Sequence, residues 1–198
     1  MEQVLAPGRR FASIWGWALV AVALLLLQGC GTTRNVTTLD GDSRLMLRGN
    51  DPVAYFSEGR PVSGKAELRA EHDGLSYRFA SEANRNAFRQ NPQKYLPAYA
   101  GFCASGAPYA LKAAIGADIF KIVDGRLFLF GSERARRHWE MDEKKNIELG
   151  DYYWENESKD VPYRVQNFKR YVFRVPHYKS DDQIEAEWQA RFGKKSSG

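Results

Sequence analysis

The chain has 198 residues, of which 43% are hydrophobic and 27% are charged, and its net charge is +5. This length is enough for one globular domain with a sizeable core. Lysines and arginines are interleaved with aspartates and glutamates, which favours a solvated surface of mixed charge, and we expect no nucleic-acid partner.

An apolar segment follows two arginines near the N-terminus. Arg9 and Arg10 precede a mostly apolar run over residues 11–27, and the pair Gly29-Cys30 follows it. This order is the layout of a bacterial secretory signal. Because the segment resembles a lipobox, we expect residues 1–29 to be a lipoprotein signal peptide and Cys30 to carry the lipid, palmitate included. An uncleaved transmembrane anchor is the alternative, since the run approaches the ~18 residues that span a bilayer.

Both alternatives place the remainder of the chain outside the cytoplasm. We expect a protein anchored by lipid in the cell envelope, at the outer membrane facing the periplasm, because Gly31 provides no inner-membrane retention signal. Residues 30–44 would then be the lipid anchor and a polar tether. Acylation consumes the thiol of Cys30, which leaves Cys103 as the single free thiol of the mature protein.

Two segments resemble each other at a spacing of 51 positions. They are DGLSYRFASEANRNAF, residues 73–88, and DGRLFLFGSERARRHW, residues 124–139. In each, Asp-Gly between apolar runs predicts a tight β-hairpin. The serines that follow, Ser81 and Ser132, predict the N-caps of two helices. The first helix should end before Asn91-Pro92, because proline disfavours helical geometry in the residue before it.

These units predict an α+β fold, with a small antiparallel sheet built from two hairpin-plus-helix units and the apolar second hairpin deep in that sheet. Between the units, the sequence predicts a short helix from about Ala107 that ends at a left-handed Gly116. Cys103 lies just before this helix. Asp51-Pro52 predicts a rigid turn into a strand over residues 53–56.

Residues 156–198 should form an extension with one strand and one helix. Phe168–Val175 alternate enough to predict a strand. Ser180 and Gln183 form a capping-box pattern, and Gly193 predicts the end of the helix. The apolar stripe of this helix is Ile184, Trp188 and Phe192. Two roles stay open for the stripe, which are packing on the main domain and docking into the groove of a partner protein.

Four separated motifs occur in a fixed order: LRGNDPVAYF from residue 47, AEHDGLSYRFASEANRNAFRQNPQKY from residue 70, YAGFCA from residue 99 and NIELGDYYWEN from residue 146. Together they resemble the YHS domain, in the form found in exported bacterial proteins. The resemblance covers residues 45–155 and implies a compact α+β fold linked to the handling of soft metals, especially copper. In the metal-associated branch, cysteines stand where this chain has Ala54 and Ala80, and alanine cannot ligate a metal.

Cys103 is the candidate for any metal or thiol chemistry. Three roles stay open for it: a packed inert thiol, a ligand of copper or another soft metal, and a redox-active thiol or nucleophile. His72 is the best-placed second ligand, and an exposed turn residue is its alternative role. His138 is expected on the solvent side of its helix. No CxxC, HxxxH or HExxH pattern occurs, and a single ligand binds metal weakly.

Two aromatic segments, YAGF at residues 99–102 and DYYWEN at residues 151–156, predict either a pocket for a small apolar or ring-shaped ligand or a tyrosine-rich core. We therefore expect a lipid-anchored, non-enzymatic binding module of the envelope that handles a soft metal. One alternative is a scaffold that binds a partner protein through its C-terminal helix. The other is a thiol-redox protein.

Overall fold

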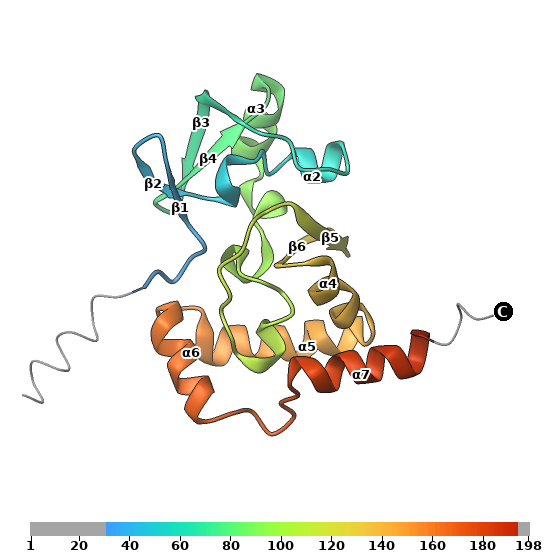
Figure 1. The fold of residues 1–198 in the computed structure, drawn as a ribbon. Helices are drawn as coiled ribbons and strands as arrows, with labels where there is room; N and C mark the ends of the chain where they lie inside the picture. The colour runs from blue at the N-terminus through green and yellow to red at the C-terminus, as the bar shows by residue number, and fades with distance from the viewer. Residues whose placement is uncertain (1–30, 194–198) are drawn as a thin grey trace, which may run out of the picture. The chain divides into compact units, whose positions relative to one another are not determined.

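A computed structural model describes residues 31–193. The chain divides into two units, Met1–Gly31 and Thr32–Gly198, and the fold below is that of the second unit (Figure 1). The predicted signal peptide and Cys30 lie outside the described residues. Within residues 31–193, no helix has the length and apolar character needed to cross a membrane. Strands and helices are mixed, so the α+β class is confirmed.

The first sheet contains the hairpin predicted at Asp73-Gly74. Its four strands, in the spatial order β1-β2-β4-β3, are β1 Thr37–Leu39, β2 Asp42–Leu45, β4 Leu75–Phe79 and β3 Lys65–His72. Asp73 and Gly74 have φ values of 49° and 71°, as a type I′ turn requires. The segment expected as a tether contributes β1 and β2. Because β2 pairs with β4 in parallel, the sheet is mixed rather than purely antiparallel.

The second hairpin forms a two-stranded sheet of its own instead of joining the first sheet. Its strands are β5 Ile119–Val123 and β6 Arg126–Phe130, joined at Asp124-Gly125. Isolated parallel bridges link Leu127 to Pro97 and Leu129 to Cys103. The free edge of β6 is therefore occupied by the crossover segment, which keeps the two sheets apart.

Strand β6 separates two hydrophobic cores. Leu127 and Leu129 belong to the core that contains Phe88 of the first repeat, whereas Phe128 and Phe130 belong to the core that contains Trp139 of the second repeat. Side chains alternate between the two faces of a strand, so each face of β6 serves one core. Burial on both faces explains why the run is continuously apolar.

The helices of the repeat begin as predicted. They are α3 Glu82–Gln90 and α4 Glu133–Glu140. The hydroxyl of Ser81 accepts a hydrogen bond from the Asn84 amide at 3.1 Å, and that of Ser132 accepts one from the Ala135 amide at 3.0 Å. Both caps satisfy an amide that the first turn of a helix leaves unpaired.

The final aromatic residue of each repeat packs in the same way. The Phe88 ring centre lies 4.8 Å from that of Tyr77 and 5.2 Å from that of Phe79. In the second copy, the Trp139 ring lies 5.2 Å from each of the two phenylalanines of β6. The sequence repeat is therefore also a repeat of core packing.

The Asp51-Pro52 turn is confirmed, but the strand predicted after it is wrong. Asp51 is fully buried, and its Oδ1 accepts a hydrogen bond from the Val53 amide at 2.8 Å. Its Oδ2 accepts bonds from the Ala80 amide at 2.8 Å and from Asn84 Nδ2 at 2.7 Å. The chain then enters the short helix α2, Ala54–Ser57. Asp51 thereby joins α2 to the start of α3.

The crossover contains short 3₁₀ turns and not the predicted helix ending at Gly116. The turns of the chain are η1 Leu47–Gly49, η2 Pro92–Tyr95, η3 Ala98–Gly101 and η4 Ala107–Tyr109. Ala110, with φ 55°, takes the left-handed conformation that was predicted for Gly116. The helix stops there because a left-handed residue reverses the chain direction.

The C-terminal extension is helical throughout its regular structure. Helix α5, Glu143–Tyr153, and η5, Trp154–Ser158, lead into the extension, and the helices of the extension itself are α6 Tyr163–Val172 and α7 Asp181–Phe192. The strand predicted over Phe168–Val175 is wrong, since most of that segment lies in α6. The prediction for α7 is confirmed, with both hydrogen bonds of the Ser180–Gln183 capping box present.

Candidate ligand pocket

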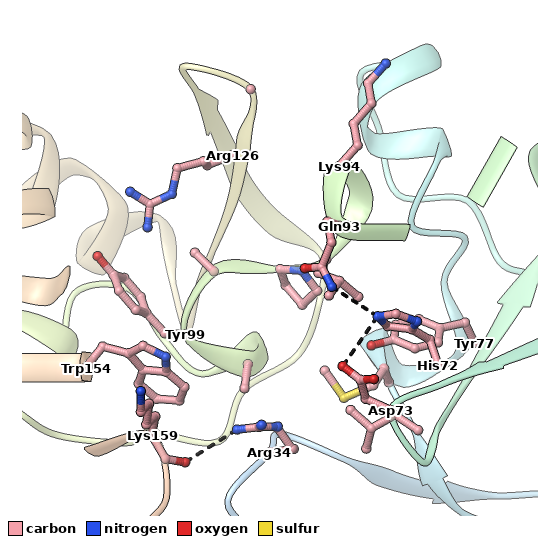
Figure 2. Close-up of a pocket in the computed structure, with 17 residues that line it drawn as sticks. Arg34, His72, Asp73, Tyr77, Gln93, Lys94, Tyr99, Arg126, Trp154 and Lys159 are labelled. Atoms are coloured by element: carbon pink, nitrogen blue, oxygen red, sulfur yellow. Dashed lines mark hydrogen bonds and ion pairs between the residues drawn. The ribbon is translucent and has the colours of Figure 1, made fainter. Parts of the chain in front are cut away.

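A pocket of about 360 Å³ opens between the β3–β4 turn, the crossover and η5 (Figure 2). His72 and Gln93 lie on one side of it, Tyr99 and Trp154 lie on the other, and Arg34 lies at the base. Both aromatic segments singled out in the sequence therefore contribute to its wall. The cavity falls within the range of ~300–1,000 Å³ that is usual for small-molecule sites.

An unusual backbone conformation positions Tyr99. Tyr99, Ala100 and Gly101 have φ values of 52°, 50° and 82°, so three consecutive residues are left-handed. This conformation is unfavourable for residues with a Cβ, and the surrounding structure must hold it. Asn35 does so, because its amide donates to the Ala100 carbonyl at 3.0 Å and its Nδ2 donates to the Gly101 carbonyl at 2.7 Å.

Tyr99 is also held by a carboxylate on α5. Its hydroxyl donates to Asp151 Oδ1 at 3.0 Å, and the Arg126 guanidinium donates two bonds to the same carboxylate at 2.7 and 2.8 Å. Burial, followed by the negative charge of Asp151, raises the pKa of Tyr99 well above its ordinary value. The phenol therefore stays protonated and acts as a donor at physiological pH.

Helix α5 approaches Tyr99 so closely that only glycine fits at position 150. A Cβ at Gly150 would lie 2.5 Å from Tyr99 Oη and 2.9 Å from Tyr99 Cζ. Real Cβ atoms essentially never make contacts this short. The wall formed by Tyr99 thus depends on the missing side chain at Gly150.

The lining of the pocket carries more positive than negative side chains. Its cations are Arg34, Lys94, Arg126 and Lys159, whereas Asp73 is its single carboxylate within residues 31–193. Asp151 pairs with Arg126, and Glu155 pairs with Lys159 at 2.7 Å. Figure 2 shows Lys94 extending away from the other side chains. Arg34 has no carboxylate partner in the part of the chain that the structure describes, and its Nη1 donates to the Lys159 carbonyl at 3.4 Å.

His72 lies in the wall of this pocket. Its Nε2 is 3.3 Å from Gln93 Nε2 and 3.4 Å from Asp73 Oδ2. The ring packs edge-on against Phe88, with the ring centres 6.1 Å apart. The side chain is 22% exposed, so His72 is a half-buried wall residue and not an exposed turn residue.

Cys103 is a packed thiol. The residue is 5% exposed, and its amide donates to the Ala113 carbonyl at 3.0 Å. Its Sγ lies 3.1 Å from Ser105 Oγ. Burial as a small apolar group, the first of the three roles considered for it, matches this environment.

A metal site at Cys103 finds little support in the donor set. Within residues 31–193, no group of three or more histidine, cysteine, aspartate or glutamate side chains could hold a metal ion. The polar contacts of Cys103 and His72 involve different residues, Ser105 for the thiol and Gln93 with Asp73 for the imidazole. One sulfur beside one hydroxyl does not fit a soft-metal site. Ligation by Cys103 and His72 stays a prediction.

The expectation that His138 faces solvent is wrong. His138 is 9% exposed, and its Nε2 lies 2.7 Å from Glu185 Oε2 on α7. Arg137 donates to the same carboxylate at 3.0 Å. Hydrogen bonds from Gln189, then from Arg137 and His138, lower the pKa of Glu185 to about 2. Glu185 thus attaches α7 to α4.

Two of the three residues in the apolar stripe of α7 pack on the domain. Ile184 and Trp188 are half-buried, and the Arg137 guanidinium lies 4.4 Å from the Trp188 ring centre. Phe192 is 51% exposed. Packing therefore accounts for Ile184 and Trp188, and docking of a partner protein on this stripe stays a prediction.

The sequence did not point to the cations of the pocket. Arg34 and Lys159 belong to no motif singled out in the sequence, and Arg126, although it lies in the second repeat, carried no predicted role. The fold alone brings them to one cavity. The aromatic segments were the single local signal, because Tyr99 and Trp154 lie in them.

The fold and the pocket define a small α+β domain with a cavity suited to a small ligand. Residues 53–99 match the model of the YHS domain family, so the resemblance is confirmed over that range. The match begins just before α2 and ends within η3, and so covers the first repeat unit. Two residues of the pocket, His72 and Tyr99, lie in the matched range. No curated protein and no solved structure gives a significant match to the chain.

Proposed function

We propose that this chain is a non-enzymatic binding module of the cell envelope, and that its pocket takes a small anionic ligand with a flat apolar part. The observation that carries the proposal is Arg34, a cation without a carboxylate partner among the described residues, at the base of a cavity walled by Tyr99 and Trp154. The proposal also draws on both repeat units, since the walls of the pocket come from each.

The chemistry of the walls supports this class of ligand. A carboxylate or phosphate can form charge-assisted hydrogen bonds with the Arg34 guanidinium. The indole of Trp154 and the phenol of Tyr99 offer flat surfaces to a ring. His72 and Gln93, on the opposite wall, can hydrogen-bond to a polar substituent.

The envelope location is proposed from the N-terminal pattern of arginines, apolar run and Gly29-Cys30. Its test is the mass of the mature protein from a bacterial membrane fraction, which should begin at Cys30 and include the added lipid. Cys30→Ser should abolish the lipid. A mature chain that keeps residues 1–29 would contradict the proposed anchor and leave the ligand proposal untouched.

Titration followed by NMR tests the ligand. Residues 32–198 form a unit of their own, so this piece can be used in isotope-labelled form. Benzoate should shift the amide signals of residues 34, 72 and 99 and the indole signal of Trp154, and neutral benzyl alcohol should bind more weakly. Arg34→Gln should weaken benzoate binding about tenfold, since it removes a hydrogen bond to a charged group.

Arg60→Gln is the matched control, because Arg60 is an exposed arginine outside the pocket. It should leave benzoate binding unchanged. Equal affinity for benzoate and benzyl alcohol, or unchanged benzoate binding in Arg34→Gln, would refute an anion site at Arg34. Shifts confined to residues outside the pocket would refute the pocket itself.

A further inference from the structure

The apolar side chains of α6 face solvent. Val165, Phe168 and Val172 recur three and four residues apart on one face of the helix, and they are 39%, 71% and 52% exposed. Tyr171 and Phe173 beside them are 78% and 68% exposed. A helix of a globular domain normally turns such a stripe toward the core, so the orientation of α6 is reversed.

The polar side chains of α6 face the protein and fix this orientation. Gln166 is fully buried, and its Nε2 donates to the Ala110 carbonyl at 2.9 Å. Asn167 Oδ1 accepts from the Lys112 amide at 2.8 Å, and Asn167 Nδ2 donates to the Lys112 carbonyl at 2.9 Å. Rotating α6 to bury Phe168 would break all three bonds. These hydrogen bonds therefore hold α6 with its apolar face toward solvent.

The first described residues of the chain are bonded to the start of α6. The Tyr163 amide donates to the Thr32 carbonyl at 3.0 Å, and Lys112 Nζ, in the crossover, donates to the Thr33 carbonyl at 3.4 Å. The N-terminal end of the described unit thus lies beside the start of α6, and the proposed lipid anchor precedes this end in the sequence.

The charge of the α6 segment suits an anionic surface. Residues 163–175 include four cations and no carboxylate, and the cations are Arg164, Lys169, Arg170 and Arg174. Glu157 pairs with both Lys169 and Arg170, so one carboxylate offsets part of this charge and the segment with Glu157 keeps a positive excess. Basic segments with exposed aromatic side chains bind at the interface of bilayers that contain anionic lipid. Phe168, Tyr171 and Phe173 provide the aromatic side chains.

We infer that the exposed face of α6, formed by Val165, Phe168, Tyr171, Val172 and Phe173, lies on the surface of the bilayer that holds the N-terminal anchor. This second contact orients the domain on the membrane. The inference uses the proposed anchor for its geometry, and it is independent of the ligand proposed for the pocket.

Vesicle sedimentation of residues 32–198 tests the face without the anchor. The protein should pellet with vesicles of equal parts phosphatidylglycerol and phosphatidylcholine, and less with phosphatidylcholine alone. Insertion of two exposed aromatic rings partway into the bilayer accounts for a roughly tenfold or larger increase in the binding of the protein to vesicles. The double variant Phe168→Glu, Phe173→Glu should therefore bind these vesicles at least tenfold more weakly. Phe192→Glu, on α7, is the matched control and should bind as the wild type does.

Three results would overturn the inference. They are no binding of residues 32–198 to the anionic vesicles, equal binding of the double variant, and equal loss in Phe192→Glu. Sedimentation velocity identifies the main competing occupant: a dimer that the double variant abolishes, without vesicle binding, would assign the face to a second copy of the chain. Unchanged circular dichroism and unchanged benzoate titration in the double variant would show that fold and pocket are intact.

Discussion

Lys112 should make the stability of the domain rise with pH. The residue is 1% exposed, and its Nζ donates to the Val161 carbonyl at 2.7 Å. It also lies 4.8 Å from the ring centre of Trp154. Burial lowers the pKa of Lys112 from 10.5 to about 8, and the charge of Arg34 adds to this effect. The perturbation that tests the effect is Lys112→Met, which keeps the length of the side chain and removes the titrating group.

The size and sign of the effect follow from proton linkage. Between pH 8 and 10.5 the unfolded chain binds a proton at Lys112 that the folded chain has lost, so the free energy of unfolding increases with pH. One pKa unit corresponds to about 1.4 kcal/mol, so the full rise is roughly 3 kcal/mol. Below pH 8 both states hold the proton and Lys112 gives no slope.

Urea unfolding of residues 32–198 at pH 7.5, 8.5 and 9.5 measures this rise. The wild type should gain roughly 2 kcal/mol over this interval relative to Lys112→Met. Lys144→Met, at an exposed position of α5, is the control and should retain the wild-type slope. The reasoning fails if Lys112→Met shows the same rise as the wild type, or if stability of the wild type falls relative to that variant.

Three further predictions concern α7, the pocket wall and the thiol. The pKa of Glu185 is lowered to about 2, so the stabilisation that Glu185 gives α7 is complete above pH 4.5 and is lost as pH falls toward 2. The fluorescence of Trp188 should report this loss. An identical acid transition in Glu185→Gln would contradict it. Gly150→Ala should displace Tyr99 and destabilise the domain by about 1–3 kcal/mol in urea unfolding, whereas unchanged stability and benzoate binding would show that the wall tolerates a Cβ. Cys103 should resist alkylation until the domain unfolds, and anaerobic Cu(I) retention by the reduced wild type but not by Cys103→Ser would establish it as a ligand.

The hairpins and their helices could be predicted from the sequence because their causes are local. Asp-Gly supplies the left-handed turn at Asp73-Gly74 and again 51 residues later. A serine hydroxyl can cap only the helix that follows it, so Ser81 and Ser132 mark helix starts without reference to the rest of the fold. The capping box at Ser180 belongs to the same class of local signal, and it was also confirmed.

Tertiary contacts decided the features that carry the proposals. Residues 168–175 alternate like a strand, yet Gln166 and Asn167 bond to residues 110 and 112 of the crossover and fix a helix with its apolar face outward. The pocket depends in the same way on contacts between distant segments, since Arg34 and Trp154 line one cavity although they are far apart in the sequence. The sequence by itself determined the local units, because adjacent residues encode turns and caps. Only the tertiary structure decided how those units meet, because burial and hydrogen bonding between distant residues outweigh local preference.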